Sequence, residues 1–146
     1  MSTIDDYFDE CLCFVSNKLV RTITDLAEKS FRGTGLSSSH AFLMLVILDC
    51  PGITPNEAAK KMDLAPSTIT RFLDKLEHKK LITRTIDRKH VHIHPTSEGK
   101  KLKKSLDDAW SNLDKRFGQS ITPEDYAAAV KVFNSVYRSL KNSENK

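Results

Sequence analysis

The segment that most constrains the fold runs from Pro66 to Lys79, with the sequence PSTITRFLDKLEHK. Its apolar residues recur at the spacing i, i+3, i+4 and i+7, which predicts an amphipathic helix. They are Ile69, Phe72, Leu73 and Leu76. The opposite face carries hydroxyl and charged side chains that can contact base edges and phosphates from a major groove. Taken alone, the segment is more typical of an ordinary helix with a solvated face. The segments before and after it favour a helix that contacts DNA.

A short helix is predicted directly before this segment. Thr54-Pro55-Asn56-Glu57 has the pattern of a capping box with proline at the first helical position, and the helix it opens extends to Met62. Residues 63–66 then form a tight turn, although Ala65 is a poor residue for the N-cap. Two helices joined by so short a turn are the helix-turn-helix pattern.

A β-hairpin is predicted directly after it. Residues 81–94 alternate apolar and polar side chains on both sides of the charged tip Asp87-Arg88-Lys89, which is the period of half-exposed strands. This hairpin would form a wing with a basic tip. Its second strand carries His90, His92 and His94 on one face at a spacing that could chelate a metal. Because no carboxylate or thiol is adjacent in the sequence, we expect a solvated face and no metal.

Long helices are predicted on both sides of this region. Between residues 4 and 31 apolar side chains recur every three or four positions without proline or glycine, which predicts one continuous helix of roughly 40 Å. That is longer than a small domain needs for its own core, so part of it should pack against a second chain. Ser37 can cap the next helix, whose residues 41–48 (AFLMLVIL) are apolar throughout and should be buried on every side.

The chain after Pro95 is predicted to form two more helices. Thr96 or Ser97 caps the first, and Thr122 followed by Pro123 opens the second. The predicted fold is therefore mainly α, a winged helix-turn-helix with a two-stranded β wing. We expect three segments that form one intertwined unit: residues 1–35 and 96–146 for dimerisation, and residues 36–95 for binding DNA.

The distribution of charge points to a polyanionic partner. The net charge is only +4, but residues 60–104 contain 13 Lys and Arg against 5 Asp and Glu, whereas the remainder contains 10 against 14. Positive potential is therefore concentrated around the predicted helix-turn-helix and wing.

Other functional classes find little support in the sequence. Cys11, Cys13 and Cys50 are too few and too irregularly spaced for a disulfide framework or a zinc site. No nucleophile with a neighbouring base, paired carboxylates or phosphate-binding glycine loop indicates an enzyme or a bound cofactor. No apolar run approaches the roughly 20 residues of a membrane span, and the acidic start MSTIDDYFDE is unlike a signal peptide. We therefore expect a cytoplasmic protein.

Three stretches together resemble the MarR family of bacterial transcriptional regulators. They are LAPSTITRFLDKLEHKKLITR (residues 64–84), the wing residues 87–89, and HPTSEGKKL (residues 94–102). The resemblance extends over nearly the whole chain in order and spacing. It implies a homodimeric winged helix-turn-helix repressor whose N- and C-terminal helices interlock. One departure is a wing two or three residues shorter than in many relatives.

The resemblance, together with the exposed face of the helix, assigns the residues that contact DNA. Ser67, Thr68, Thr70 and Arg71 would face the major groove, and Lys75 would contact a phosphate. Arg88, with Lys89 beside it, would enter or border the minor groove, where negative potential favours arginine. The start of the helix that begins near residue 37 could add backbone contacts through Ser37, Ser39 and His40.

The family also implies a mechanism of regulation. A dimer would dock its two recognition helices in successive major grooves of a pseudo-palindromic operator. A small amphipathic or aromatic effector, bound between the dimer helices and the winged domain, would change their separation and release the DNA. The ligand-binding residues cannot be assigned from the sequence.

Two alternatives keep the fold and change the function. The first is a winged-helix module for protein interaction or DNA architecture. The second is a thiol-based peroxide sensor acting through Cys13, because Leu12-Cys13-Phe14 is similar to the first helix of the family's organic-hydroperoxide sensors. The acidic residues around it oppose formation of a thiolate, so a buried structural cysteine is the expectation.

Overall fold

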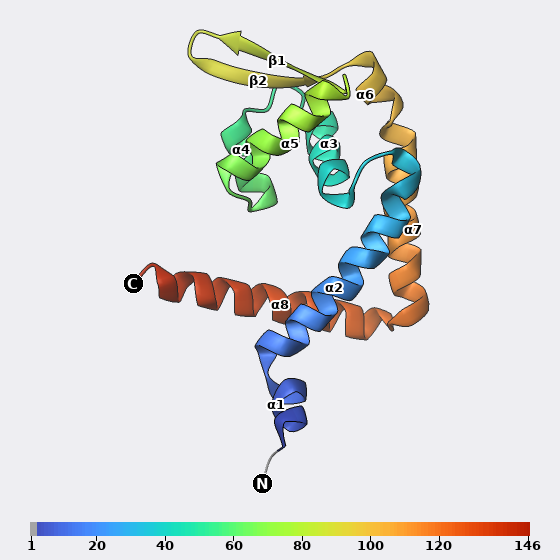
Figure 1. Cartoon of the computed structure of the whole chain (residues 1–146), viewed down its shortest axis with the longest axis vertical. Helices are drawn as coiled ribbons and strands as arrows, with labels where there is room; N and C mark the ends of the chain where they lie inside the picture. The colour runs from blue at the N-terminus through green and yellow to red at the C-terminus, as the bar shows by residue number, and fades with distance from the viewer. Residues whose placement is uncertain (1–2) are drawn as a thin grey trace. The chain divides into compact units, whose positions relative to one another are not determined.

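The structure is a computed structural model that describes residues 3–146, and it is mainly helical with one antiparallel sheet (Figure 1). The elements are α1 (Ile4–Glu10), α2 (Leu12–Phe31), the 3-10 turn η1 (Arg32–Thr34), α3 (Ser38–Asp49), α4 (Pro55–Met62), α5 (Pro66–His78), β1 (Ile82–Asp87), β2 (His90–Pro95), α6 (Ser97–Lys101), α7 (Lys103–Ser120) and α8 (Pro123–Glu144). The chain divides into two compact units; the first ends at Trp110 and the second begins at Ser111, inside α7. The predicted fold class, a winged helix-turn-helix with a two-stranded wing, is confirmed.

Helix α3 is the centre of the core in the first unit. It contacts α2, α4, α5, α6 and β2, because its sequence offers apolar side chains in every direction. The side chains of Leu43, Met44 and Ile47 are completely buried. The prediction of burial on every side is only partly right, since Phe42 and Leu45 remain half-buried within the single chain.

The helix starts follow the capping residues of the sequence. The side chains of Ser37, Thr54, Thr96 and Thr122 each accept a hydrogen bond from a backbone N–H in the first turn of the helix they open. Ala65 makes no such bond, so α5 begins without a side-chain cap. The helix-turn-helix connection is instead closed by Asp63, which adopts a left-handed backbone conformation with φ of 51°. The predicted caps are therefore confirmed.

The prediction of one continuous helix from residue 4 to residue 31 is wrong. Cys11 has φ of −82° and ψ of 120°, an extended conformation that separates α1 from α2. The break brings the rings of Phe8 and Phe14 to 4.3 Å between centroids and lets Lys18 pair with Asp9 at 3.1 Å. In a straight helix residues six apart lie roughly 9 Å apart along the axis, so these contacts require the bend. Apolar spacing alone could not reveal it, because the period of three to four residues continues across Cys11.

The helix predicted after Pro95 is also interrupted, at Leu102 between α6 and α7. The Leu102 N–H bonds the Gly99 carbonyl at 3.2 Å, a tighter turn than an α-helix makes. Gly99 itself lies against the backbone, since a Cβ there would be 2.1 Å from the Leu81 carbonyl oxygen. The start of α6 is thereby tied to the connection between α5 and β1, and Thr96 Oγ1 adds a bond to the Lys80 carbonyl at 2.7 Å.

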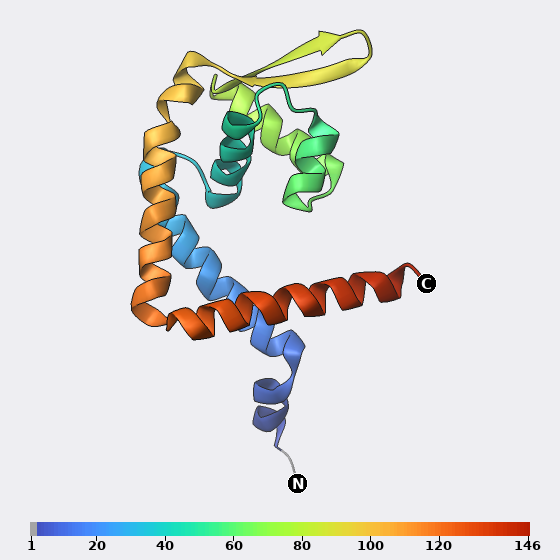
Figure 2. The ribbon, with the colours of Figure 1, turned by 180° about the vertical axis from the view of Figure 1, so that it is seen from behind.

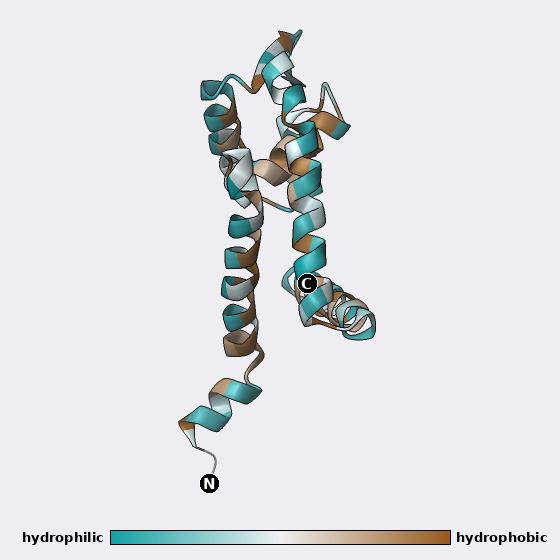
Figure 3. Ribbon diagram, turned by 90° about the vertical axis from the view of Figure 1, so that its right-hand side faces the viewer, coloured by the Kyte–Doolittle hydropathy of each residue, from teal (hydrophilic) through white to brown (hydrophobic). Residues whose placement is uncertain are grey.

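Large apolar side chains remain exposed on the helices outside the winged region. In the first unit a hydrophobic stripe runs along one side of α2 (Figure 3). The exposed large apolar side chains of α2 include Leu12, Phe14, Val15, Leu19 and Val20, and α1 adds Ile4, Tyr7 and Phe8. In the second unit α8 exposes Tyr126, Val130, Val132, Phe133, Tyr137 and Leu140. No single helix between residues 3 and 146 has both the length and the apolar character to cross a membrane.

Candidate nucleic-acid interface

Helix α5 buries one face and presents the other to solvent. Ile69, Leu73 and Leu76 are buried in the core, as their spacing predicts. The opposite face exposes Ser67, Thr70, Arg71 and Lys75, and leaves Thr68 half-buried. The Thr70 hydroxyl donates to the Pro66 carbonyl at 3.0 Å, so it lies against its own helix. The side chains predicted to face a major groove are accessible together on one surface.

The wing is a hairpin closed by only two residues. Asp87 pairs with His90 across the strands, so Arg88 and Lys89 form the whole turn. The sequence suggested that Asp87 is part of the tip, but Asp87 is the last residue of β1. Arg88 has φ of 56°, a left-handed conformation that glycine, asparagine and aspartate adopt more readily than arginine. The hairpin projects past α4, and both turn residues are exposed (Figure 2).

The base of the wing is anchored by the connection between α3 and α4. The Gly52 N–H donates to the Ile93 carbonyl at 2.7 Å, and the Ile93 N–H donates to the Ile53 carbonyl at 2.9 Å. His92 Nδ1 adds a bond to the Gly52 carbonyl at 2.9 Å. These bonds extend the sheet by a short third segment that the sequence did not predict. They also correct the expectation of a solvated histidine face, because His92 and His94 are half-buried.

Arg84 connects the wing to α5. Its guanidinium donates from Nε to Glu77 Oε2 at 2.9 Å and from Nη2 to Asp74 Oδ1 at 2.7 Å. The hydrogen bond with Glu77, followed by that with Asp74, raises the pKa of Arg84 above its ordinary value. Two carboxylates on α5 that would repel phosphates are thus paired with a cation. The sequence predicted Arg84 only as a strand residue. No local pattern indicates its bonds with Glu77 and Asp74, which lie seven and ten residues earlier in the chain.

The start of α3 meets α5 through His40. The imidazole lies 4.5 Å from the Phe72 ring, between centroids, and its Nδ1 is 2.5 Å from the Ser37 hydroxyl. Burial lowers the pKa of His40, and the neighbouring charges of Lys75 and Lys79 lower it further, while Glu28 acts in the opposite direction. Of the three residues proposed here for backbone contacts, Ser39 is exposed, whereas Ser37 and His40 are half-buried.

Family comparison agrees with this geometry. A model of the MarR family matches residues 36–90, which extend from the start of α3 to the beginning of β2. The winged helix-turn-helix region of the chain is therefore similar to the MarR family. The match supports the class predicted from the sequence, a DNA-binding transcriptional regulator and not an enzyme.

Proteins similar to this chain include a curated repressor and several solved structures. The HTH-type transcriptional repressor YetL of Bacillus subtilis (strain 168) is 25% identical over 126 residues, which cover 82% of this chain and 75% of YetL. An S. aureus MepR–DNA complex superposes with a TM-score of 0.78 at 18% identity, covering 88% of this chain and 97% of MepR. CouR of Rhodococcus jostii RHA1, bound to p-coumaroyl-CoA, has a TM-score of 0.69 at 23% identity, covering 91% and 93%.

Cys13 is not the buried structural cysteine that was expected. Its side chain is exposed on α2 in the single chain. The Asn17 amide lies 3.6 Å from the sulfur and donates to the Cys13 carbonyl at 2.7 Å. Cys11, at the break between α1 and α2, is half-buried.

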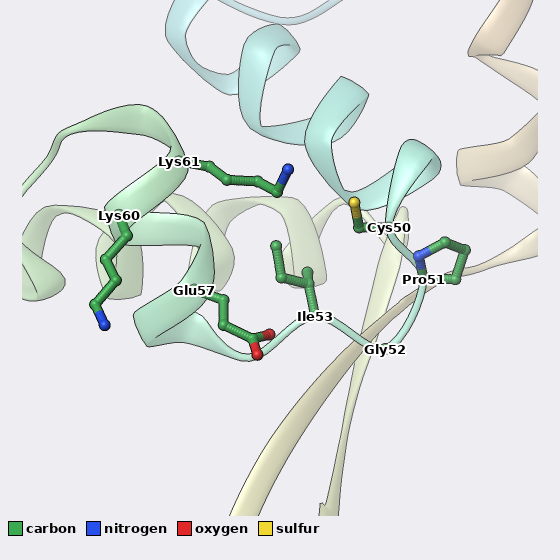
Figure 4. Close-up of a pocket in the computed structure, with 7 residues that line it drawn as sticks. All are labelled: Cys50, Pro51, Gly52, Ile53, Glu57, Lys60 and Lys61. Carbon is green, nitrogen blue, oxygen red and sulfur yellow. The ribbon is translucent and has the colours of Figure 1, made fainter.

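A cavity of about 520 Å³ lies where α3 ends and α4 begins. Figure 4 shows Lys61 extending from α4 toward the Cys50 sulfur. The cavity is also lined by Pro51, Gly52, Ile53, Glu57 and Lys60. Glu57 is already engaged, since its carboxylate accepts the Thr54 N–H at 2.9 Å. In the part of the chain described, residues 3–146, no three His, Cys, Asp or Glu side chains are grouped to hold a metal ion.

Proposed function

We propose that this regulator binds double-stranded DNA as a homodimer and represses transcription from a pseudo-palindromic operator. The observation that carries the proposal is the connection of α5 to the wing through Arg84, which fixes the exposed polar face of α5 and the turn residues Arg88 and Lys89 in one register. A helix and a hairpin held in this way can enter a major and an adjacent minor groove together. The excess of positive charge in residues 60–104 suits the phosphate backbone.

The exposed apolar side chains support self-association. Each unit leaves a row of large hydrophobic residues in water: on α1 and α2 in the first, and on α8 in the second. Contiguous apolar surface of this kind is uncommon on monomers and marks protein interfaces. A second copy of the same chain supplies matching surfaces, because a two-fold dimer uses the same patch on both subunits.

The repressor role and the response to a ligand rest on relatives. YetL is a transcriptional repressor, MepR has been crystallised with DNA, and CouR with p-coumaroyl-CoA. We infer a small amphipathic or aromatic effector that binds the DNA-free conformation more tightly, since only differential affinity shifts a conformational equilibrium. Such a regulator would act in the cytoplasm, beside the chromosome.

The decisive experiment is selection of operator DNA from a random pool by the purified protein. Arg71→Ala and Arg88→Ala are then compared with wild type on the selected operator and on random DNA. Both variants should weaken operator binding by about tenfold or more, as loss of a base or groove contact does. Lys141→Ala, at the end of α8, is the matched loss of a cation away from α5 and the wing, and should bind like wild type. Wild-type affinity in both arginine variants would refute the assignment of the DNA surface.

Exposure of Cys13 favours thiol sensing as a second candidate function. An organic hydroperoxide would oxidise the thiolate to a sulfenic acid, transferring one oxygen and leaving the corresponding alcohol. Hydroperoxide should then release wild-type protein from DNA and leave Cys13→Ser bound. Equal release of both proteins would exclude this role for Cys13.

A further inference from the structure

Ile86, on β1 of the wing, is the most exposed large hydrophobic side chain among residues 3–146, with 78% of its surface accessible. The other exposed large hydrophobic residues of this region lie on α1, α2, α7 or α8. Ile86 alone lies between α3 and α6, in the part of the chain proposed to meet DNA. Single exposed apolar residues are common. Ile86 differs from these in its position in the hairpin.

Strand geometry fixes the side of the wing on which Ile86 lies. Alternate residues of a strand share a face, so Ile86 follows Ile82 and Arg84. Ile82 is buried in the core, and Arg84 reaches the carboxylates of α5. The face that carries Ile86 is therefore the one directed toward α5. Ile86, two residues beyond Arg84, lies on this face but outside the core, and its cross-strand neighbour is Val91.

A DNA backbone must pass along this face if the proposed function holds. A helix in the major groove and a hairpin tip in the adjacent minor groove lie on either side of one sugar–phosphate strand. That strand has to run between α5 and the hairpin, next to the residue that precedes the tip on the α5 side. This residue is Ile86, since Asp87 lies on the opposite face and Arg88 begins the turn.

We propose that Ile86 packs against the deoxyribose rings of this strand and is a sequence-independent apolar DNA contact of the wing. The inference rests on the proposed function and names a further residue of the same interface. The sugar carbons offer an apolar surface between charged phosphates, which an uncharged branched side chain can cover. A second copy of the chain is a poorer occupant, because the cations Arg88 and Lys89 next to Ile86 would meet the same cations of the copy.

The test uses Ile86→Thr, which keeps the branched Cβ preferred in strands and removes apolar surface. The change replaces the ethyl group of Ile86 with a hydroxyl; losing the burial of even one CH2 group per protomer weakens binding by about fourfold each, or about fifteenfold for a dimer. Operator and random DNA should lose affinity by the same factor. The slope of log affinity against log salt should not change, because no phosphate contact is lost. Melting temperature should stay at the wild-type value, since Ile86 is exposed.

Thr85→Ala is the matched control on the other face of β1 and should bind like wild type. Arg88→Ala serves as the electrostatic reference and should reduce the salt slope. If Ile86→Thr binds like wild type while Arg88→Ala is weakened, the inference is overturned and the proposed function stands. If wild type itself selects no operator, the proposed function fails first. If Ile86→Thr changes self-association in sedimentation equilibrium without DNA, Ile86 belongs to a protein interface and the inference is wrong.

Discussion

Arg84 of β1 and Glu77 of α5 are joined by a hydrogen bond of 2.9 Å between Nε and Oε2, so the wing and α5 share an ion pair. Asp74, one turn earlier on α5, binds the same guanidinium at 2.7 Å. Without Arg84, both carboxylates would lie on α5 without this cationic partner. The relationship couples the position of the hairpin to the charge of the helix.

Arg84→Ala should weaken operator binding by about tenfold, because it frees two carboxylates on α5 to repel phosphates and loosens the wing. The free energy of unfolding should fall by only about 1 kcal/mol, since solvent screens a pair of this exposure. Fluorescence anisotropy with labelled operator and urea unfolding measure the two effects. Lys104→Ala, which breaks the exposed pair with Asp108, is the control and should change neither. Restored affinity in the triple variant Arg84→Ala, Asp74→Asn, Glu77→Gln would identify the carboxylates as the cause.

Arg88→Gly should separate stability from DNA binding. The wing turn holds Arg88 at φ of 56°, which glycine adopts without the penalty that a Cβ brings. The free energy of unfolding should rise by about 0.5–1 kcal/mol while operator binding weakens. Thermal unfolding and titration with DNA check both signs. Arg88→Lys keeps the charge and the strain, and should therefore match wild type in stability. A destabilised Arg88→Gly would contradict the turn geometry.

Gly99→Ala should severely destabilise the protein. An added Cβ would lie 2.1 Å from the Leu81 carbonyl oxygen and 2.7 Å from Met44 Cε. The start of α6 would have to move away from the end of α5, which we expect to lower the free energy of unfolding by about 3 kcal/mol. Gly118→Ala is the control, because nothing lies within 4 Å of its added Cβ in α7. That change should be neutral or stabilising by up to about 1 kcal/mol.

Stability should fall as the pH drops below about 6.5, in part through His40. Its pKa in the folded protein is lowered from the ordinary value of 6.5, by burial and then by Lys75 and Lys79. The unfolded chain therefore takes up the proton first as the pH falls, which favours unfolding. Melting temperatures between pH 7.5 and 5.5 should decline more steeply for wild type than for His40→Gln. His90→Gln, at an exposed position, should follow wild type. Parallel curves for wild type and His40→Gln would contradict the prediction.

Local pattern was sufficient for the elements that carry the site. The spacing of Ile69, Leu73 and Leu76 predicted the buried face of α5, and thereby the exposed residues opposite. The alternation before Pro95 predicted the hairpin, and the hydroxyl residues predicted the helix starts. Each of these depends on residues within one or two turns of the chain, where sequence and backbone geometry are directly linked.

Features that depend on distant residues were not predictable in the same way. The bond between Ile93 and Ile53 joins segments 40 residues apart, and nothing near either residue indicates it. The break at Cys11 lacks proline and glycine, and becomes intelligible only through the contact of Phe8 with Phe14. The pairing of Arg84 likewise needs the hairpin to be folded onto α5.

Glu28, in the last part of α2, joins this helix to the start of α3. Its Oε1 accepts the Ser38 backbone N–H at 2.9 Å and also the Ser38 hydroxyl, at the first turn of α3. Ser38 is buried, so this joint is shielded from competing water. A rotation of α2 would carry the start of α3 with it, and His40 would pass the movement to Phe72 on α5. The Glu28 carboxylate thus couples a movement of α2 to α3 and, through His40, to the α5 residues that we propose contact the operator.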